Sequence, residues 1–230
     1  MAGPDREQPH WVLGEKHFNE RRLRTQRGDP VRDASRDGTL TRIRIEMATD
    51  PIAALMDYAR IPIAFRVTHV FNVTGDDVDG IVLSECKVEI PYVKDYDAVA
   101  GNGPMQWERR FDMSRFFVFV ARLGDARIGG AAIVLNPTWL TGDRRDVAML
   151  WDIRVAPSAR RRGVGSALFK HVERWARSNG FSELTIETQN TNVPACRFYA
   201  RHGCSLTACD RSAYTELPSD VQLVWSKTLS

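Results

Sequence analysis

Charge of one sign and long apolar runs are both scarce in this sequence. The 32 basic and 29 acidic residues leave a formal net charge of +3, which gives no field strong enough to indicate a nucleic acid partner. No apolar run approaches the roughly 18 residues that a membrane-spanning helix needs, and residues 1–30 lack the apolar segment of a secretory signal. We therefore expect a cytoplasmic protein with no nucleic acid or membrane partner.

Paired cysteines are also missing. The four cysteines, Cys86, Cys196, Cys204 and Cys209, include no Cys-x-x-Cys pair, and the five histidines show no ligand spacing. Zinc sites and disulfide frameworks both depend on such spacing. We expect reduced thiols, as the cytoplasm favours, and no metal site.

The size and composition suit one domain with a polar extension. The chain has 230 residues, of which 43% are hydrophobic, enough for a single core. Residues 1–40 mix both signs of charge without sustained periodicity, so we expect a disordered or loosely docked tail. Ile43, Ile45 and Met47 then alternate with charged residues, which indicates a strand and the start of a single domain over residues 41–230.

The remaining chain alternates between strand-like and helix-like runs. Asp50 and Pro51 are residue types that cap and open a helix, and Val164, Leu168 and Val172 begin an apolar stripe with helical spacing. We predict helices over 51–59, 164–178 and 193–201, strands over 64–73, 81–90, 116–123, 127–135, 147–155, 184–188, 204–209 and 221–225, and loops around Gly101 and over 137–146. This order predicts a mixed α/β fold.

A glycine loop joins the strand at 147–155 to the helix at 164–178. It reads Arg160-Arg161-Arg162-Gly163-Val164-Gly165. The first N–H groups of a helix lack internal partners and carry positive partial charge, glycine lets a phosphate approach the main chain, and arginine suits phosphate. The loop favours a pyrophosphate site, with a solvated turn as the alternative. The following Ser166-Ala167-Leu168 fits neither a nucleoside-triphosphate loop nor a dinucleotide fingerprint.

Two motifs carry a resemblance to a known superfamily. The first is Asp152-Ile153-Arg154-Val155-Ala156-Pro157 followed by Arg160-x-x-Gly163-x-Gly165, and the second is Asn192-x-x-Ala195-x-x-Phe198-Tyr199. Together they resemble the GNAT superfamily of acetyl-CoA-dependent N-acetyltransferases. Glu187-Thr188-Gln189-Asn190 and Pro91-Tyr92-Val93-Lys94 add a closer resemblance to the streptothricin acetyltransferases. The resemblance implies a mixed, mostly antiparallel sheet with a splayed parallel strand pair, flanked by helices.

The resemblance places acetyl-CoA along the splayed strands and the glycine loop. It implies that main-chain groups of Ile153 and Val155 pair with the pantetheine arm, while loop N–H groups hold the pyrophosphate, in agreement with the physical argument above. The expected cofactor-binding residues are Ile153, Arg154, Val155, Arg160, Arg161, Arg162, Gly163, Val164, Gly165, Ser166, Asn192 and Ala195.

Three side chains are candidates for proton transfer. Tyr199 occupies the general-acid position of the resembled family, and a phenol can protonate a departing thiolate. Its alternative role is packing beside Phe198. Asp152 and Glu187 are candidate general bases, and the alternative for each is a structural carboxylate.

Residue 151 departs from the streptothricin pattern, because Trp151 stands where such relatives carry Glu. Strand alternation predicts Asp152 and Arg154 on one face and Trp151, Ile153 and Val155 on the other. Asp152 would then point toward the amine site.

The resemblance implies a primary amine of a small molecule as the acceptor, with a streptothricin-like antibiotic acetylated on a β-lysine amine as the sharpest candidate. An aromatic and acidic lining suits a cation, and candidate wall residues are Tyr92, Asp95, Tyr96, Trp139 and Tyr214. The alternatives are acetylation of a protein lysine or N-terminal amine, and a non-catalytic acyl-CoA-binding module. The sequence leaves open whether the protein is a monomer or a homodimer.

Overall fold

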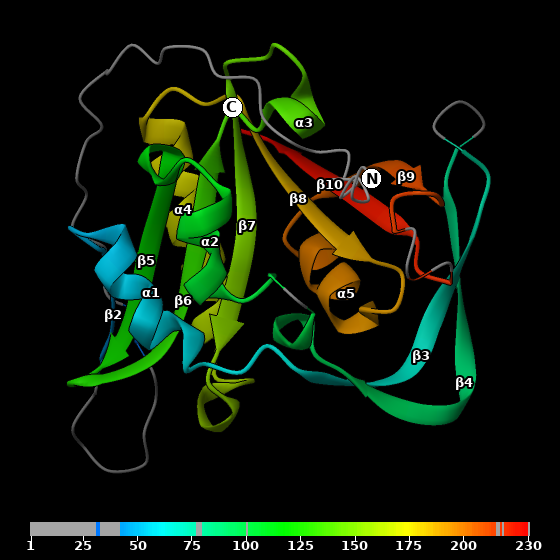
Figure 1. Cartoon of the computed structure of the whole chain (residues 1–230), viewed down its shortest axis with the longest axis horizontal. Coiled ribbons are helices and arrows are strands. Elements are labelled where there is room, and N and C mark those ends of the chain that lie inside the picture. Colours follow the sequence, from blue (N-terminus) through cyan, green and yellow to red (C-terminus); the bar gives the residue numbers. More distant parts are fainter. Residues whose placement is uncertain are drawn as a thin grey trace, which may run out of the picture.

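An eight-stranded sheet forms the centre of the computed structural model, which describes residues 31–32, 42–76, 80–99, 101–214, 217 and 219–229. The strand order is β1-β2-β5-β6-β7-β8-β10-β9 (Figure 1). The strands are β1 (Val31–Arg32), β2 (Arg42–Met47), β5 (Phe116–Leu123), β6 (Ala126–Leu135), β7 (Val147–Val155), β8 (Glu183–Gln189), β9 (Ser205–Asp210) and β10 (Gln222–Thr228). Among the described strand pairs only β7 and β8 run parallel, which confirms the predicted mixed, mostly antiparallel sheet.

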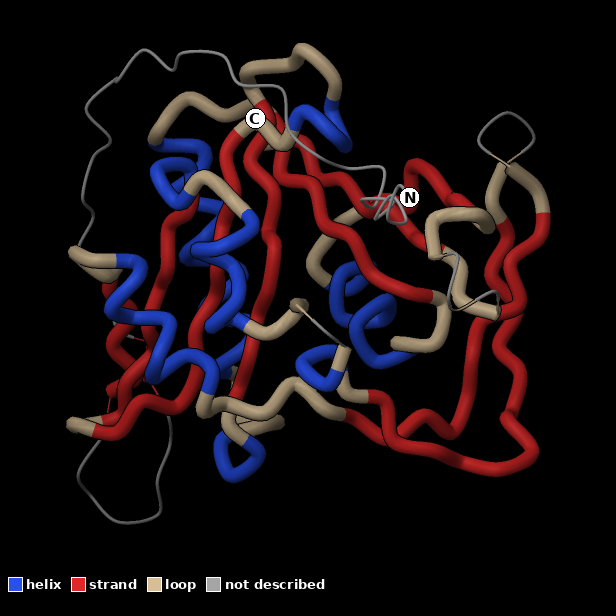
Figure 2. The backbone as a smooth tube through the Cα atoms, viewed as in Figure 1, coloured by secondary structure: helices blue, strands red, loops and turns tan. Residues whose placement is uncertain are grey.

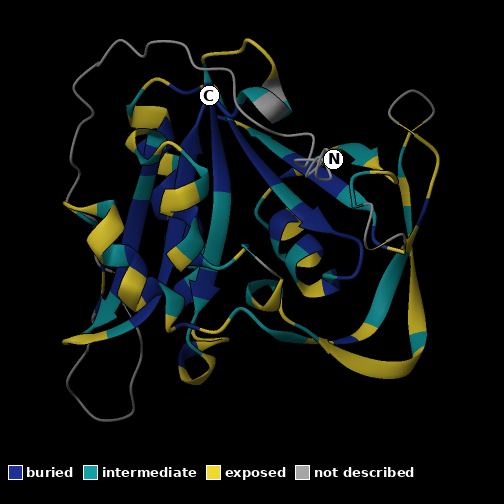
Figure 3. Ribbon diagram, in the orientation of Figure 1, coloured by how far each residue is buried: buried dark blue, intermediate teal, exposed yellow. Residues whose placement is uncertain are grey.

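Helices cover both faces of this sheet. The described helices are α1 (Pro51–Ala59), α2 (Pro104–Arg110), α3 (Thr138–Thr141), α4 (Val164–Ser178) and α5 (Val193–Arg201). One buried cluster joins α4 and α5 to the strands, and a second joins α1 and α2 to the opposite face through Leu55, Tyr58 and Trp107. Figure 1 shows α1 and α2 in front of β5 to β7 with α4 behind, and Figure 3 shows that the strands between them are mostly buried.

The apolar stripe predicted for α4 is buried. Val164, Leu168, Val172 and Trp175 have at most 2% of their surface exposed, whereas Lys170 is exposed. Burying a side chain of this size contributes about 1.5–3 kcal/mol, so the stripe fixes α4 against the sheet. The bounds of α1, α4 and α5 agree with the prediction.

A long hairpin stands apart from the central sheet. Strands β3 (Phe65–Thr74) and β4 (Val82–Lys94) pair only with each other, and Figure 2 shows them curving away along one side. The hairpin joins the body at Phe71, whose N–H donates to the Asn190 carbonyl at 3.0 Å and whose carbonyl accepts from Asn190 Nδ2 at 3.0 Å. The hairpin therefore returns the chain close to the end of β8.

Two short helices lie where the sequence predicts no helix. Helix α2 begins with Pro104 after the loop glycines, and its Trp107 is 2% exposed. Helix α3 lies inside the loop predicted over 137–146. Both helices are too short to show the apolar periodicity that identifies α4.

Strand β7 contains an irregularity that reverses its side-chain alternation. Its register against β6 shifts at this point: Leu150 lies opposite Ile133 and Asp152 lies opposite the adjacent Ala132, so that Trp151 is the additional residue on β7. Trp151 packs with the α1–α2 cluster, whereas Ile153 and Val155 pack with the α4–α5 cluster. The prediction that Trp151 shares a face with these two residues is wrong, because a β-bulge adds one residue to the strand.

The predicted N-terminal tail is largely outside the described residues. Within residues 1–40 the structure describes Val31–Arg32, which pairs antiparallel with β2. In the described ranges no helix has the length and apolar character needed to cross a membrane.

Candidate active site

Strands β7 and β8 separate partway along their length. Their parallel pairing begins at Val147 and Glu183 and ends at Leu150 and Ile186. Beyond these residues β7 continues along β6, and β8 continues along β10. The facing strand edges therefore diverge, which confirms the predicted splayed pair.

The backbone of Ile153 and Val155 points into this separation. Ala156 N–H donates to the Ile128 carbonyl of β6 at 2.9 Å. Because backbone groups of successive strand residues alternate in direction, those of Ile153 and Val155 face β8 instead. An extended ligand with amide groups could form strand-like hydrogen bonds there.

The glycine loop presents an unusual run of backbone N–H groups at the start of α4. Arg161 and Gly163 have positive φ angles of 60° and 82°, and alternation of this kind forms a concave nest of N–H groups. No side chain caps α4, and Ala167 N–H, which donates to the Gly163 carbonyl at 2.9 Å, makes the first bond of the helix. The N–H groups of Val164, Gly165 and Ser166 thus have no partner within the helix. This geometry suits an anion.

The arginines of the first motif occupy different environments. Arg161 and Arg162 are exposed and can add positive charge beside the nest. Arg160 instead braces the loop, because its guanidinium donates to the carbonyls of Val155 and Pro62, each at 3.1 Å. The side chain of Arg154 is only 1% exposed, and by the same alternation its backbone groups face β6. Neither part of Arg154 therefore faces the separation between β7 and β8, unlike Ile153 and Val155.

A buried ionic cluster holds Asp152 and Arg154 on the α1–α2 face. Arg154 forms two hydrogen bonds with Asp97, at 2.6 and 2.8 Å, and its Nη2 lies 2.8 Å from Asp152 Oδ2. The Tyr58 hydroxyl donates to Asp152 Oδ1 at 2.7 Å. Asp97 belongs to the 3-10 turn η1 (Tyr96–Ala98), so the cluster ties that turn to β7.

Helix α5 brings the second motif beside the separated strands. Asn192 caps α5 by accepting the Ala195 N–H at 3.2 Å, and its Nδ2 lies 3.5 Å from the Tyr96 hydroxyl. Tyr199 is 6% exposed and packs against Phe169, with ring centroids 6.3 Å apart. Burial raises the pKa of the Tyr199 phenol, and the negative charge of Asp152 raises it further. The phenol therefore stays protonated at neutral pH.

Glu187 lies on β8 just beyond the last parallel pair. The Tyr214 hydroxyl donates to Glu187 Oε1 at 2.6 Å. Burial raises the pKa of the Glu187 carboxyl above its usual value, while hydrogen bonds from Tyr214 and Gln222 act in the opposite direction. Glu187 is thus a carboxylate held by neutral partners.

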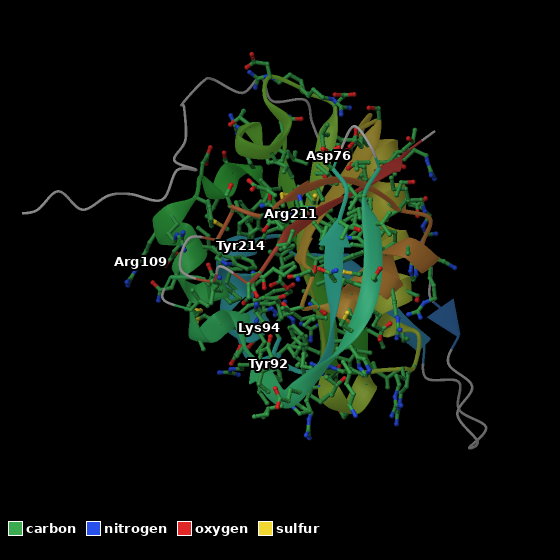
Figure 4. All side chains as sticks on the ribbon, turned by 90° about the vertical axis from the view of Figure 1, so that its right-hand side faces the viewer. Asp76, Tyr92, Lys94, Arg109, Arg211 and Tyr214 are labelled. Carbon is green, nitrogen blue, oxygen red and sulfur yellow. The ribbon has the colours of Figure 1, made fainter. Side chains whose placement is uncertain are left out.

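An ion pair joins the long hairpin to the loop that precedes β10. Lys94, at the end of β4, pairs with the buried Asp220 and also donates to Thr191 Oγ1 at 3.2 Å. Figure 4 views this end of the molecule from the hairpin side, with Tyr92 and Lys94 below Tyr214. Burial raises the pKa of the Tyr92 phenol, and the negative charge of Asp220 raises it further.

The predicted wall residues of the amine site differ in their contacts and exposure. Tyr96 and Tyr214 contact other site residues, Tyr92 is 43% exposed, and Asp95 caps η1 by accepting the Asp97 N–H at 3.0 Å. The side chain of Trp139 lies outside the described residues.

Sequence reasoning missed the partners of Arg154 and Asp152. Asp97 lies 57 residues from Arg154, and Tyr58 lies 94 residues from Asp152. No spacing rule connects positions so far apart. The two acidic residues flanking Tyr96 were the only local signal at η1.

The family follows from comparison with known sequences. A sequence model described as the acetyltransferase (GNAT) family matches residues 86–204. The chain belongs to the GNAT acetyltransferase family. It is therefore an acyltransferase, and the splayed strands and glycine loop described above lie within the matched residues.

Individual relatives sharpen this placement. The chain is 32% identical over 160 residues to a streptothricin acetyltransferase of Streptomyces lavendulae, covering 68% of this chain and 79% of that protein. It is 39% identical over 80 residues to streptothricin acetyltransferase A of Bacillus subtilis, a match that spans 34% of this chain and about half (46%) of that relative. Among solved structures, a nourseothricin acetyltransferase aligns with a TM-score of 0.63 and 25% identity, covering 82% of this chain and 99% of the other.

Proposed function

We propose that this GNAT protein transfers an acetyl group from acetyl-CoA to a primary amine of a small molecule. The observation that carries the proposal is the continuous path from the separated strands β7 and β8 to the uncapped start of α4. We place the reaction in the cytoplasm, where the free cysteines stay reduced.

Coenzyme A binds chiefly to backbone groups in this proposal. The pantetheine arm pairs with Ile153 and Val155, and the pyrophosphate accepts hydrogen bonds from the nest over residues 161–166. The exposed Arg161 and Arg162 add charge-assisted contacts. Arg160 acts indirectly, because its bonds to Val155 and Pro62 fix the loop.

Tyr199 is the proposed general acid. Attack of a neutral amine on the thioester gives a tetrahedral intermediate, whose collapse breaks the C–S bond and expels the coenzyme A thiolate. The Tyr199 phenol donates its proton to this sulfur and is reprotonated from solvent. Its raised pKa keeps the proton available until the thiolate forms.

Glu187 is the proposed proton acceptor. The charge of Asp152 is offset by Arg154, and its oxygens already accept from Arg154 and Tyr58. Glu187 is held by neutral groups, and its raised pKa brings it closer to the operating pH at which a base is most effective. We assign Asp152 the role of holding Arg154, and through it the η1 turn.

A streptothricin-like antibiotic is the proposed acceptor, supported by the relatives named above. The test is acetyl-CoA-dependent thiol release with streptothricin, an aminoglycoside and a lysine-containing peptide in parallel. We expect streptothricin to give the highest kcat/KM, with acetylation on a β-lysine amine identified by mass spectrometry. Preference for the peptide would favour protein acetylation, coenzyme A binding without turnover would favour a sensor module, and absence of coenzyme A binding would overturn the proposal.

A further inference from the structure

One buried amide oxygen beside the proposed base lacks a hydrogen-bond donor. Gln189 is the last residue of β8 and only 8% exposed. Among the described residues, nothing donates to its side-chain oxygen Oε1. A buried acceptor without a donor costs folding free energy, and such groups in native proteins call for an explanation.

Gln189 is aimed into the same site as Glu187. The two residues are separated by one position on β8, so their side chains share a face, while Ile186 packs into the α4–α5 cluster on the other face. Tyr214 connects them, because its hydroxyl donates to Glu187 at 2.6 Å and is hydrogen-bonded to the side chain of Gln189. The free Oε1 therefore lies on the same face of β8 as the Glu187 carboxylate, among the polar side chains of the proposed acceptor site.

We propose that Gln189 Oε1 binds a second hydrogen-bond donor of the acceptor molecule, an ammonium group, while Glu187 faces the reacting amine. This inference rests on the proposed function and names the acceptor class as a diamine. The two residues are roughly 7 Å apart along the strand, so we expect the two nitrogens of the acceptor to be joined by a short alkyl chain. An ammonium fits better than a hydroxyl, because the Glu187 charge lies next to the amide oxygen and charge-assisted bonds are stronger.

The strand direction supports this division of roles. The parallel pairing of β8 with β7 ends at Ile186, so Glu187 lies nearest the point where the strands diverge. Gln189 lies further along β8, where the two strands are more separated. It is therefore a specificity-determining residue, placed to contact the distal part of the acceptor.

A matched series of amines tests the proposal. The full-length protein is assayed with acetyl-CoA and 1,5-diaminopentane, 5-aminopentan-1-ol or 1-aminopentane, with streptothricin as a reference. We expect kcat/KM for the diamine to exceed that for the monoamine by about tenfold or more, the usual size of one hydrogen bond to a charged donor. The amino alcohol should fall between them.

The decisive variant is Gln189→Met, which keeps the length of the side chain and removes the acceptor oxygen. We expect it to lower the diamine-to-monoamine ratio of kcat/KM by about tenfold. The ratio is the readout because Met also removes the hydrogen bond between Gln189 and Tyr214, a loss that affects both amines. Thr188→Val is the control, since Thr188 is equally buried at 8% exposure but lies on the other face of β8.

The outcomes separate this inference from the proposed function. A ratio that Gln189→Met leaves unchanged, a ratio that Thr188→Val lowers equally, or turnover of streptothricin without any turnover of the amine series would overturn the role of Gln189. Absence of turnover with streptothricin and every amine would instead overturn the proposed function.

Discussion

The proposed cofactor side and the proposed acceptor side of the site meet where β7 and β8 separate, and they consist of different kinds of chemical group. On the cofactor side the proposed binding groups are backbone N–H and C=O groups from one continuous stretch, residues 153–166. On the acceptor side they are side chains from α1, β4, η1, β7, β8 and the loop before β10, joined by hydrogen bonds and buried ion pairs.

This difference decides how each side responds to mutation. Backbone donors keep their chemistry when a side chain changes, so the cofactor side depends on loop conformation, above all on the positive φ of Gly163. The acceptor side depends on partners far apart in sequence, and losing one leaves another buried without compensation. We therefore expect different substitutions to change different quantities: the Kd for coenzyme A, the free energy of unfolding, or kcat.

The largest expected effect is on turnover, at the border of the two sides. Tyr199→Phe removes only the phenol oxygen, which is the proposed proton donor, and should lower kcat by about 100- to 10,000-fold. The Kd for coenzyme A measured by calorimetry should stay unchanged, because Tyr199 contributes no group to the nest. Unchanged kcat would return Tyr199 to a packing role beside Phe198.

Breaking the ionic cluster should affect stability next. Arg154→Met leaves Asp152 and Asp97 without their shared cation and should lower the free energy of unfolding by about 3–5 kcal/mol, measured by urea denaturation. Arg160→Met is the matched control on the exposed side of the same motif. It removes hydrogen bonds to two carbonyls and should cost about 1 kcal/mol. Equal losses in the two variants would contradict the difference between the two sides.

The same contrast explains which parts of the molecule were predictable. The bounds of α4 followed from a local signal, its apolar stripe, and the glycine loop followed from the needs of a helix start. The exchange of faces at Trp151 could not be predicted, since a bulge depends on register with β6. The pairing of Arg154 with Asp97 could not be predicted either, because it joins segments that only the complete fold brings together.

The glycine loop offers a test of the cofactor side alone. Gly163→Asp forces a side chain into a left-handed conformation and places a negative charge beside the proposed pyrophosphate. Like charges at 4 Å near a protein surface repel by up to about 4 kcal/mol, so calorimetry should show a loss of coenzyme A affinity of about 100-fold or more. Gly180→Asp is the control, because Gly180 has nearly the same φ, 83° against 82°, at the opposite end of α4. Equal losses of affinity would assign the effect to backbone strain.

The smallest expected effect is a shift in pH dependence on the acceptor side. Glu187 must be ionised to accept a proton, so kcat/KM should fall as the pH drops through its pKa, which burial raises above the usual carboxyl value. The Tyr214 hydrogen bond stabilises the ionised form and lowers that pKa. Tyr214→Phe should therefore move the acid limb of the profile to higher pH, whereas Glu187→Gln should remove the limb together with most of the activity.

A profile that Tyr214→Phe leaves in place would mean that another group titrates, and Asp152→Asn would then be the variant to compare. Tyr214 connects Glu187 to Gln189, so this experiment also measures how far the acceptor side acts as one hydrogen-bonded unit, in contrast to the separate backbone donors around α4.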